Sequence, residues 1–346
     1  FCSIFHSQKS YFQMYATALL SISYLCCISG WIYPSVEHLI SKQFSNRFNV
    51  RLKSSEVPTK NRLLRVVTDI DDTVKSSGNK RLVGIPLGGI DAQYERGKFY
   101  PGVFQFALEL SKNSLNNPNN VEPLPVAVLT ARAREFLFAL ELKHEHPVSV
   151  GYRNCGIENG YENWGLGTVL YGSVKEWICW MRKSKRKFKN FRKLLEKDIA
   201  ESITNGYKID YIFIGDTGEG DTKAGVKMCE SFPDELKATF LHSVSCDDEC
   251  CLLPDDYYVN GVPVFFFKTY VGAAAKAYKA GFIDKKAVKR VISTAVKELT
   301  LSGAPVDSSK WEDLEADIEQ AKRVLSADRK TMSSHLPTIA KYMETM

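Results

Sequence analysis

The sequence predicts an α/β protein with a doubly wound, mostly parallel sheet. From residue 62 to 282, short β-branched and aromatic runs alternate with segments whose apolar residues recur at helical spacing. The short runs are apolar at successive positions, as in strands that are covered by helices on both faces of a sheet. The 346 residues, of which 44% are hydrophobic and 25% charged, suffice for a large core and exclude fibrous and wholly disordered classes.

The first half of this region supplies three strands and two helices. The turn signal Tyr-Pro-Gly at 100–102 marks the start of the first helix, and the other elements follow from hydrophobic periodicity. In chain order, we expect a strand at 63–71, a helix at 103–113, a strand at 123–131, a helix at 134–145 and a strand at 167–173.

The second half begins with a strongly basic helix, expected at 174–199 with a break around Ser184. Continuous apolar runs then predict strands at 207–216, 237–244 and 262–270, the last one preceded by a hairpin turn. From Ile283 onward, the sequence is charged and amphipathic, which predicts helices to the C-terminus.

The N-terminal region is uncharged from Ser10 to Val36, and residues 11–33 are long enough to cross a hydrocarbon core. This segment is a membrane anchor, a removed targeting peptide, or a buried or disordered tail. As an anchor, it would hold the following domain in the cytosol, because more Lys and Arg follow it than precede it. The expected organisation is a possible anchor or targeting segment at 1–40, a linker at 41–61, the α/β domain at 62–282 and a helical extension at 283–346.

Acidic residues follow two of the predicted strands. Asp69 and Asp71 are two positions apart, so on an extended backbone both side chains lie on one face. Asp216 and Asp221 form a second group at the end of another strand, among glycines that let the backbone turn closely around an ion. Carboxylates at such range repel unless a cation intervenes, and oxygen ligands at a strand end suit Mg²⁺. The sequence therefore predicts a magnesium site at the carboxyl ends of the strands.

The sequence also offers side chains that would bind a phosphoryl group beside this site. Thr130, at the end of the second expected strand, would supply a hydroxyl donor, and a lysine of the basic helix would supply a fixed positive charge.

Four motifs in this order resemble those of the haloacid dehalogenase superfamily of phosphotransferases. They are D-x-D-x-T at 69–73, Thr130, a lysine and G-D-x-x-x-x-D at 215–221. More narrowly, "DIDDTVKSSG", "FYPGV" at 99–103 and "FIGDTGEGD" resemble the catalytic domain of the actin-patch-associated phosphatidate phosphatases. The similarity covers about residues 62–282, and its first and last motifs are the specific ones. It implies a haloacid dehalogenase-like, Rossmannoid fold.

The resemblance also implies a role for each matching residue. Asp69 would be the nucleophile that forms an aspartyl-phosphate, and Asp71 would protonate the leaving oxygen and later activate water. Thr130 would bind phosphoryl oxygens. Mg²⁺ would be held by Asp216, with Asp221, beside the Asp69 carboxylate and the main-chain carbonyl of Asp71.

For the lysine, helical spacing favours Lys187, because Phe191 and Leu194 then follow four and seven positions later on one face. Lys189 has Lys193 at plus four, which is a poorer pattern for a face that packs on a core. Lys185 is a further alternative.

The second motif departs from the phosphatidate phosphatase pattern, because many members carry Ser-x-Ser-Pro-Trp where this chain has "LTARARE" at 129–135. Arg132 and Arg134 either bind an acidic substrate, for which Arg132 is our candidate, or cap and solvate the next helix. About 55 residues separate the first two motifs, which leaves no room for a large cap domain. An open site suits a lipid head group or a macromolecular phosphate better than a small metabolite.

These observations predict a Mg²⁺-dependent phosphatase that hydrolyses phosphatidate to diacylglycerol at a cytosolic membrane face. One alternative is a phosphoprotein or soluble phosphate-ester phosphatase of the same superfamily, and another is a non-catalytic membrane adaptor that binds acidic lipid. Residues 182–193 hold eight basic side chains in twelve, so an anionic membrane surface is the expected partner unless the run is only a solvated face. No nucleic-acid partner is expected, and the sequence offers no prediction of protein partners.

Overall fold

The computed structural model describes residues 62–79, 81–82, 85–86, 89–112, 122–133, 141–172, 180–205, 207–218, 220–244 and 252–343. All of them belong to the compact unit Lys60–Met346. The segment 1–40 and the linker 41–61, with the expected anchor or targeting peptide, lie outside the described residues. In the part of the chain that is described, no helix is both long and apolar enough to span a bilayer.

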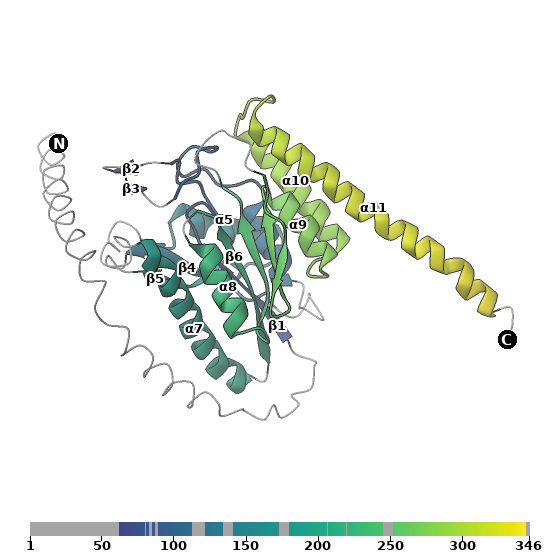
Figure 1. Cartoon of the computed structure of the whole chain (residues 1–346), viewed down its shortest axis with the longest axis horizontal. Helices are drawn as coiled ribbons and strands as arrows, with labels where there is room; N and C mark the ends of the chain where they lie inside the picture. Colours follow the sequence, from purple (N-terminus) through teal and green to yellow (C-terminus); the bar gives the residue numbers. More distant parts are fainter. Residues whose placement is uncertain are drawn as a thin grey trace, which may run out of the picture. The chain divides into compact units, whose positions relative to one another are not determined.

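The centre of the fold is a seven-stranded sheet in the order β5-β4-β1-β6-β7-β9-β8 (Figure 1). Every neighbouring pair is parallel except the β8–β9 hairpin. The strands are β1 (Arg62–Thr68), β4 (Val126–Ala133), β5 (Leu166–Gly172), β6 (Lys208–Asp216), β7 (Leu236–His242), β8 (Tyr257–Val259) and β9 (Val262–Phe267), and a separate hairpin joins β2 (Arg81–Leu82) to β3 (Ile85–Pro86).

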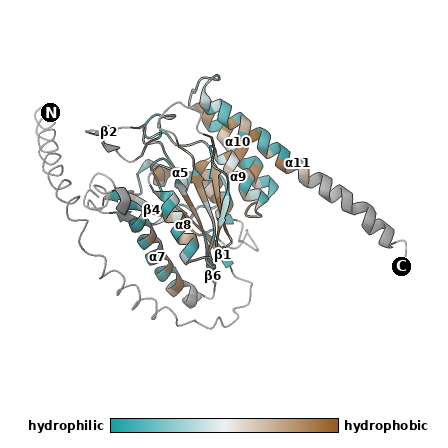
Figure 2. Cartoon of the chain, viewed as in Figure 1, coloured by the Kyte–Doolittle hydropathy of each residue, from teal (hydrophilic) through white to brown (hydrophobic). Residues whose placement is uncertain are grey.

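Helices cover both faces of this sheet, which confirms the predicted doubly wound α/β class. Alternate side chains of β6 supply the two cores: Ile212 and Ile214 pack on one face, and Tyr211 and Phe213 on the other. Figure 2 shows these strands and the inner helix faces as the hydrophobic part of the molecule. One face carries α7 (Trp180–Asn205) and α8 (Asp221–Ser231), and the other carries α3 (Val103–Lys112), α5 (Pro147–Glu158), α9 (Tyr270–Lys279), α10 (Lys285–Leu301) and α11 (Ser309–Met343).

The C-terminal helices share the hydrophobic core of the α/β domain. Val291 and Leu299 of α10 and Leu314 of α11 are buried in the same cluster as Phe106 of α3. Helices were expected from Ile283 onward, and α10 and α11 confirm this.

Two expected helices differ from the structure. The helix predicted at 134–145 is wrong over 141–145, where the chain is a loop; its first residues, 134–140, lie outside the described part. The helix of this region begins at Pro147, which suits a first helical position because proline has no N–H to pair there. The break expected around Ser184 is also wrong, because α7 is continuous across it.

The topology brings the two acidic motifs together. β1 and β6 are parallel neighbours with Thr68 opposite Ile214, and the Asp69 amide donates to the Ile214 carbonyl at 3.0 Å. β4 flanks β1 on its other side with Val128 opposite Thr68. Between β1 and β4, the described residues form only the β2–β3 hairpin, loops and α3, so no cap domain is evident there.

Candidate active site

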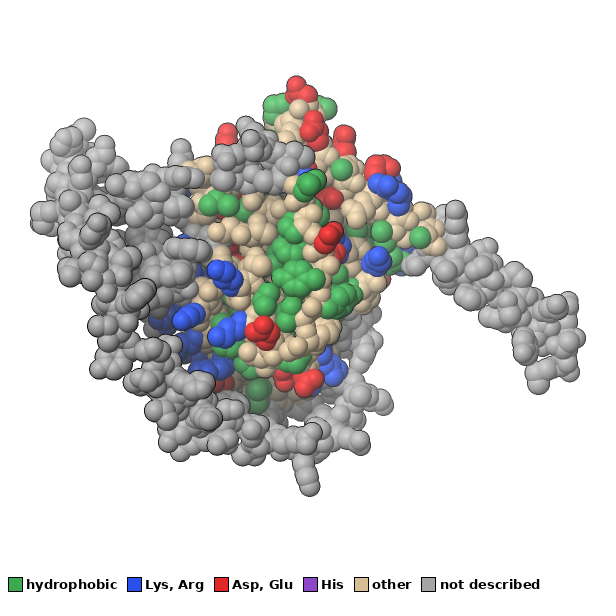
Figure 3. Space-filling model, viewed as in Figure 1, with side chains coloured by type: hydrophobic (Ala, Val, Ile, Leu, Met, Phe, Trp, Pro, Cys, Tyr) green, Lys and Arg blue, Asp and Glu red, His purple; other side chains and the backbone are tan. Residues whose placement is uncertain are grey.

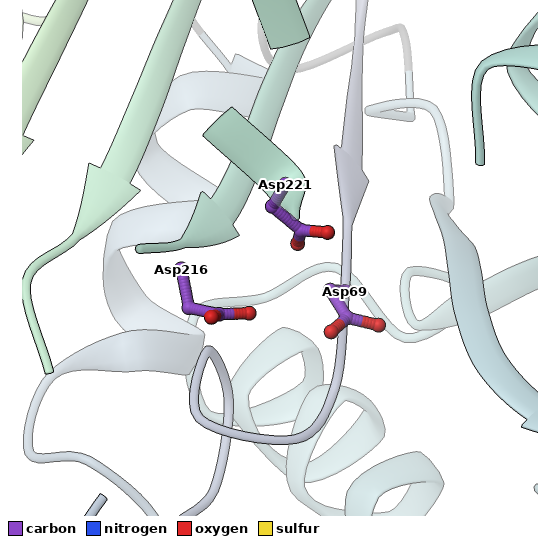
Figure 4. Close-up of side chains that lie close together, drawn as sticks. All are labelled: Asp69, Asp216 and Asp221. Carbon is purple, nitrogen blue, oxygen red and sulfur yellow. The ribbon is translucent and has the colours of Figure 1, made fainter. Parts of the chain in front are cut away.

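Three buried aspartates meet where the central strands end (Figure 4). Asp69 follows β1, Asp216 ends β6, and Asp221 is the first residue of α8. Each offers a carboxylate oxygen, and these oxygens all lie within 4.8 Å of one another. No side chain of the three is more than 2% exposed. The structure therefore joins residues that are far apart in sequence into one carboxylate cluster, which we call the aspartate triad.

Glycines make the loop between β6 and α8 tight enough for this meeting. A Cβ atom on Gly215 would lie 2.5 Å from Oδ2 of Asp221, so only glycine leaves the carboxylate in place. Gly218 donates its amide to Oδ1 of Asp216 at 2.6 Å. Gly220 has a φ of +92° at the position before α8, a backbone conformation that glycine adopts without strain.

Among the described residues, α7 places the ammonium group of Lys187 against the triad. Lys187 is 1% exposed, its Nζ lies 2.9 Å from Oδ2 of Asp69, and it also donates to Oδ1 of Asp221. Burial alone would lower the pKa of Lys187, but attraction to Asp221 and Asp69 outweighs this and raises it. The alternatives Lys185 and Lys189 are exposed. The structure thus places the lysine favoured by helical spacing at the triad.

One buried ammonium does not balance three carboxylates. Burial raises the pKa of Asp69 to about 8 against the opposing attraction of Lys187, and repulsion by Asp221 adds to the rise. Burial also raises the pKa of Asp216 well above its ordinary value, again with repulsion by Asp221. Both shifts mean that the triad resists full ionisation unless a further positive charge is supplied.

The residues present fit a hard divalent cation. Oδ1 of Asp69 and Oδ2 of Asp221 are buried and accept no hydrogen bond from the described residues. Buried acceptors normally find a donor, so two such oxygens in one cluster are compatible with a set of metal ligands. The donors are all carboxylate oxygens, which is the chemistry that Mg²⁺ prefers.

Asp71 lies apart from the triad with its carboxylate turned to basic side chains. Arg132 binds it with both Nε and Nη2 at 3.0 Å, and Nζ of Lys75 lies 3.6 Å from Oδ1. Burial alone would raise the pKa of Asp71, but attraction to Arg132 and Lys75 lowers it. The expected contact between a metal and the main-chain carbonyl of Asp71 stays a prediction.

Thr130 and Arg132 lie on β4, beside the end of β1. Thr130 is buried, and its Oγ1 accepts a hydrogen bond from the Arg132 amide at 3.2 Å. His146 lies at the start of α5: burial, together with the positive charges of Arg132 and Lys75, lowers its pKa to about 4. Arg134, the other arginine of this motif, lies outside the described residues.

Sequence reasoning assigned no role to three of the residues at this site: Lys75, His146 and Asp72. Lys75 follows Asp71 by four positions within a turn, where no periodic pattern signals a contact. His146 precedes Pro147 and caps α5, a helix start that the expected helix at 134–145 concealed. Asp72 was visible as the third aspartate of "DIDD", but only the folded backbone shows where its side chain points.

Comparisons with models of protein families, with curated proteins and with solved structures find no match to this chain.

Proposed function

We propose that the protein is a Mg²⁺-dependent phosphatase that works through an aspartyl-phosphate. The observation that carries this proposal is the aspartate triad with Lys187 against it, since it combines a nucleophilic carboxylate, a cation site and a fixed ammonium. The resemblance of the motifs around Asp69 and Asp216 to the haloacid dehalogenase superfamily supports the same chemistry.

When bound, Mg²⁺ would supply positive charge that lets the triad ionise and that polarises phosphoryl oxygens. Asp69 attacks phosphorus, so that an Asp69 oxygen to phosphorus bond forms while the bond to the leaving oxygen breaks. Asp71 gives its proton to that leaving oxygen. It then takes a proton from water, whose oxygen attacks phosphorus and releases Asp69 and inorganic phosphate.

Arg132 gives this mechanism a substrate-dependent step. In the structure it holds Asp71 ionised, and an ionised carboxylate has no proton to donate. A phosphate dianion is a stronger partner for a guanidinium than a carboxylate is, so an incoming substrate draws Arg132 away. Without this cation the pKa of Asp71 rises, and Asp71 takes up a proton from solvent before it gives one to the leaving oxygen. Thr130 and Lys187 then bind the phosphoryl oxygens, as the resemblance implies.

The proposed substrate is phosphatidate, with diacylglycerol as the product. No cap domain is evident in the described part of the chain, and a site without a cap domain suits a phosphate that stays attached to a membrane. A phosphoprotein or a soluble ester would fit the same chemistry. A non-catalytic adaptor would need the basic surface described next but not the buried triad.

The helices α7 and α8 carry an exposed basic face, which supports membrane association with the active domain on the cytoplasmic side. Figure 3 shows Lys and Arg side chains gathered over these two helices. Each Lys or Arg at an anionic surface contributes about 1 kcal/mol to binding. The exposed cations of this basic face are Lys185, Lys189, Arg192 and Lys193 of α7 and Lys223 and Lys227 of α8.

The test is phosphate release from dispersed phosphatidate with Mg²⁺. We expect turnover by the wild type and none by Asp69→Asn, with liposome binding unchanged in that variant. Binding without turnover would favour the adaptor, and turnover of soluble esters alone would favour the second phosphatase.

The membrane part of the proposal has its own matched pair of variants. Replacing Lys185, Lys189 and Lys193 by Glu should weaken binding to acidic liposomes and turnover of phosphatidate, but not turnover of a soluble ester. The same change at Lys286, Lys289 and Lys297 on the other side of the sheet should leave all three unchanged. Equal effects of both triple variants would remove α7 and α8 as the docking face.

A further inference from the structure

Asp72 has a backbone conformation that is unfavourable for a residue with a side chain. Its φ is +60°, in the left-handed region, and it is one of only three such non-glycine residues among those that the structure describes. The residue is fully buried, directly after Asp71. Non-glycine residues in this region cost free energy, and they persist where the surroundings compensate, often at functional sites.

The compensation comes from the carboxylate of Asp72. Its Oδ1 accepts the amide of Ser77 at 2.8 Å, and its Oδ2 accepts the amides of Ile90 and Asp91 at 2.5 and 2.9 Å. The main chain of Gly89 comes so close that a Cβ there would lie 2.0 Å from Oδ2. One side chain thus binds its own loop to the segment that follows the β2–β3 hairpin.

The held segment is part of the site's surroundings. Ile90 packs on the loop of Asp216, since a Cβ on Gly218 would lie 2.7 Å from its Cγ1. Asp91 accepts the hydroxyl of Tyr100 at 2.8 Å. On the other side, Nδ1 of His242 lies 2.7 Å from the main-chain oxygen of Asp72. Asp72 therefore links the loop of the first acidic motif, the base of the hairpin and the loop of the second acidic motif.

We propose that Asp72 is a positioning residue: its carboxylate clamps the segment Gly89–Asp91 against the Asp69–Asp71 loop and thereby fixes where Asp71 points. The catalytic consequence rests on the phosphatase function proposed above, whereas the clamp itself does not. Without the three amide bonds, the strained turn at Asp72 relaxes, and Asp71 loses the direction in which it delivers its proton.

Two substitutions separate the side chain from the backbone strain. Asp72→Gly relieves the positive φ and removes all three bonds. Asp72→Asn keeps the shape but has one acceptor oxygen, so its amide group must face at least one N–H donor. Gly89→Ala disrupts the same contact from the other segment, because its Cβ would clash with Oδ2 of Asp72. Asp198→Asn is the matched control, because Asp198 is also buried but pairs with Arg65 and Tyr211 near the start of β1.

The first measurement is hydrogen exchange of the Ile90 and Asp91 amides. We expect exchange to become at least about tenfold faster in Asp72→Gly and Gly89→Ala, because each lost bond weakens local closure. In Asp72→Asn, the one remaining oxygen serves either Ser77 or these two amides, so exchange should become faster at one of the two places. The Asp198→Asn control should keep the wild-type rates at these two amides. Unchanged exchange in Asp72→Gly and Gly89→Ala would overturn the clamp, whatever reaction the protein catalyses.

The second measurement compares an alkyl phosphate with an activated aryl phosphate, whose leaving group needs little protonation. Misplacing Asp71 should lower kcat for the alkyl ester about a hundredfold and for the aryl ester less than tenfold, with KM nearly unchanged. Equal losses on both esters would refute positioning of Asp71 and leave only a structural clamp. No turnover of phosphatidate or of either ester by the wild type would instead remove the proposed function, and exchange alone would then decide on the clamp.

Discussion

The stabilisation of the fold by Mg²⁺ should grow as the pH rises from about 5 to about 7. The experiment removes or adds Mg²⁺ at each pH. In the metal-free protein, burial raises the pKa of Asp69 to about 8, whereas an aspartate in an unfolded chain titrates near 3.9. Between these values, the folded state keeps a proton that the unfolded state has released. Stability of the metal-free fold therefore falls as pH rises through this window.

The magnitude follows from the size of the window. One group that stays protonated only in the folded state costs about 1.4 kcal/mol of stability per pH unit, so two units cost roughly 2.7 kcal/mol. The raised pKa of Asp216 acts in the same direction. With Mg²⁺ bound, the carboxylates are ionised in both states and this loss disappears. At roughly 2 °C per kcal/mol for a domain of this size, Mg²⁺ should raise the melting temperature about 5 °C more at the higher pH.

The assay is thermal unfolding in chelator and in saturating Mg²⁺ at three pH values. Asp69→Asn is the control. Its amide does not titrate, so the part of the pH dependence that Asp69 causes should vanish. A Mg²⁺ effect that is constant or shrinks with rising pH would refute the argument that a metal replaces protons at the triad.

Three further predictions concern single side chains. Lys187→Met should destabilise the metal-free protein by about 3–5 kcal/mol in chemical denaturation, because it leaves buried carboxylates without their ammonium, while the exposed Lys185→Met should not. Arg132→Ala should raise KM for phosphatidate by about tenfold or more in steady-state kinetics, since it removes a charge-assisted partner for the phosphate; an unchanged KM would remove Arg132 from substrate binding. Gly215→Ala should weaken Mg²⁺ binding in titration calorimetry by displacing Asp221, whereas Gly165→Ala, where a Cβ meets nothing closer than 3.7 Å, should not.

The parts of the fold that the sequence predicted are those with a strong local signal. β1 and β6 are largely apolar runs, with Asp69 directly after β1 and Asp216 at the end of β6, so both the strands and the meeting of the two aspartates at one end of the sheet follow from parallel topology. Lys187 was distinguished from its neighbours by Phe191 and Leu194, and both are buried in the core under α7. In both cases the signal is local: an apolar run for the two strands, and helical spacing for Lys187.

The parts that were missed depend on contacts between distant loops. The pairing of Asp71 with Arg132 joins residues 61 positions apart, and nothing in the loop of Asp71 or in the strand of Arg132 signals the other. The helix α9 was concealed because an aromatic strand run passes into it within three residues, and its start is marked only by the cap Thr269. Residues 141–145 have helical spacing, but Leu142 donates its amide to the hydroxyl of Tyr171, a tertiary contact that propensity cannot anticipate.

The charge run of α7 was ambiguous in the sequence because one helix carries both a buried lysine and several exposed cations. Lys187 lies on the buried side with Phe191, whereas Lys185 and Lys189 lie on the exposed side. These positions fall within one helical turn, and a turn advances only about 5.4 Å along the axis. A bilayer held at the exposed cations would therefore lie close to the end of the helix that reaches the triad. Under the proposed function, a membrane at these cations brings the head-group phosphate to the side of the domain that carries Lys187, which is why reversing the outer charges should spare soluble esters and reduce only lipid turnover.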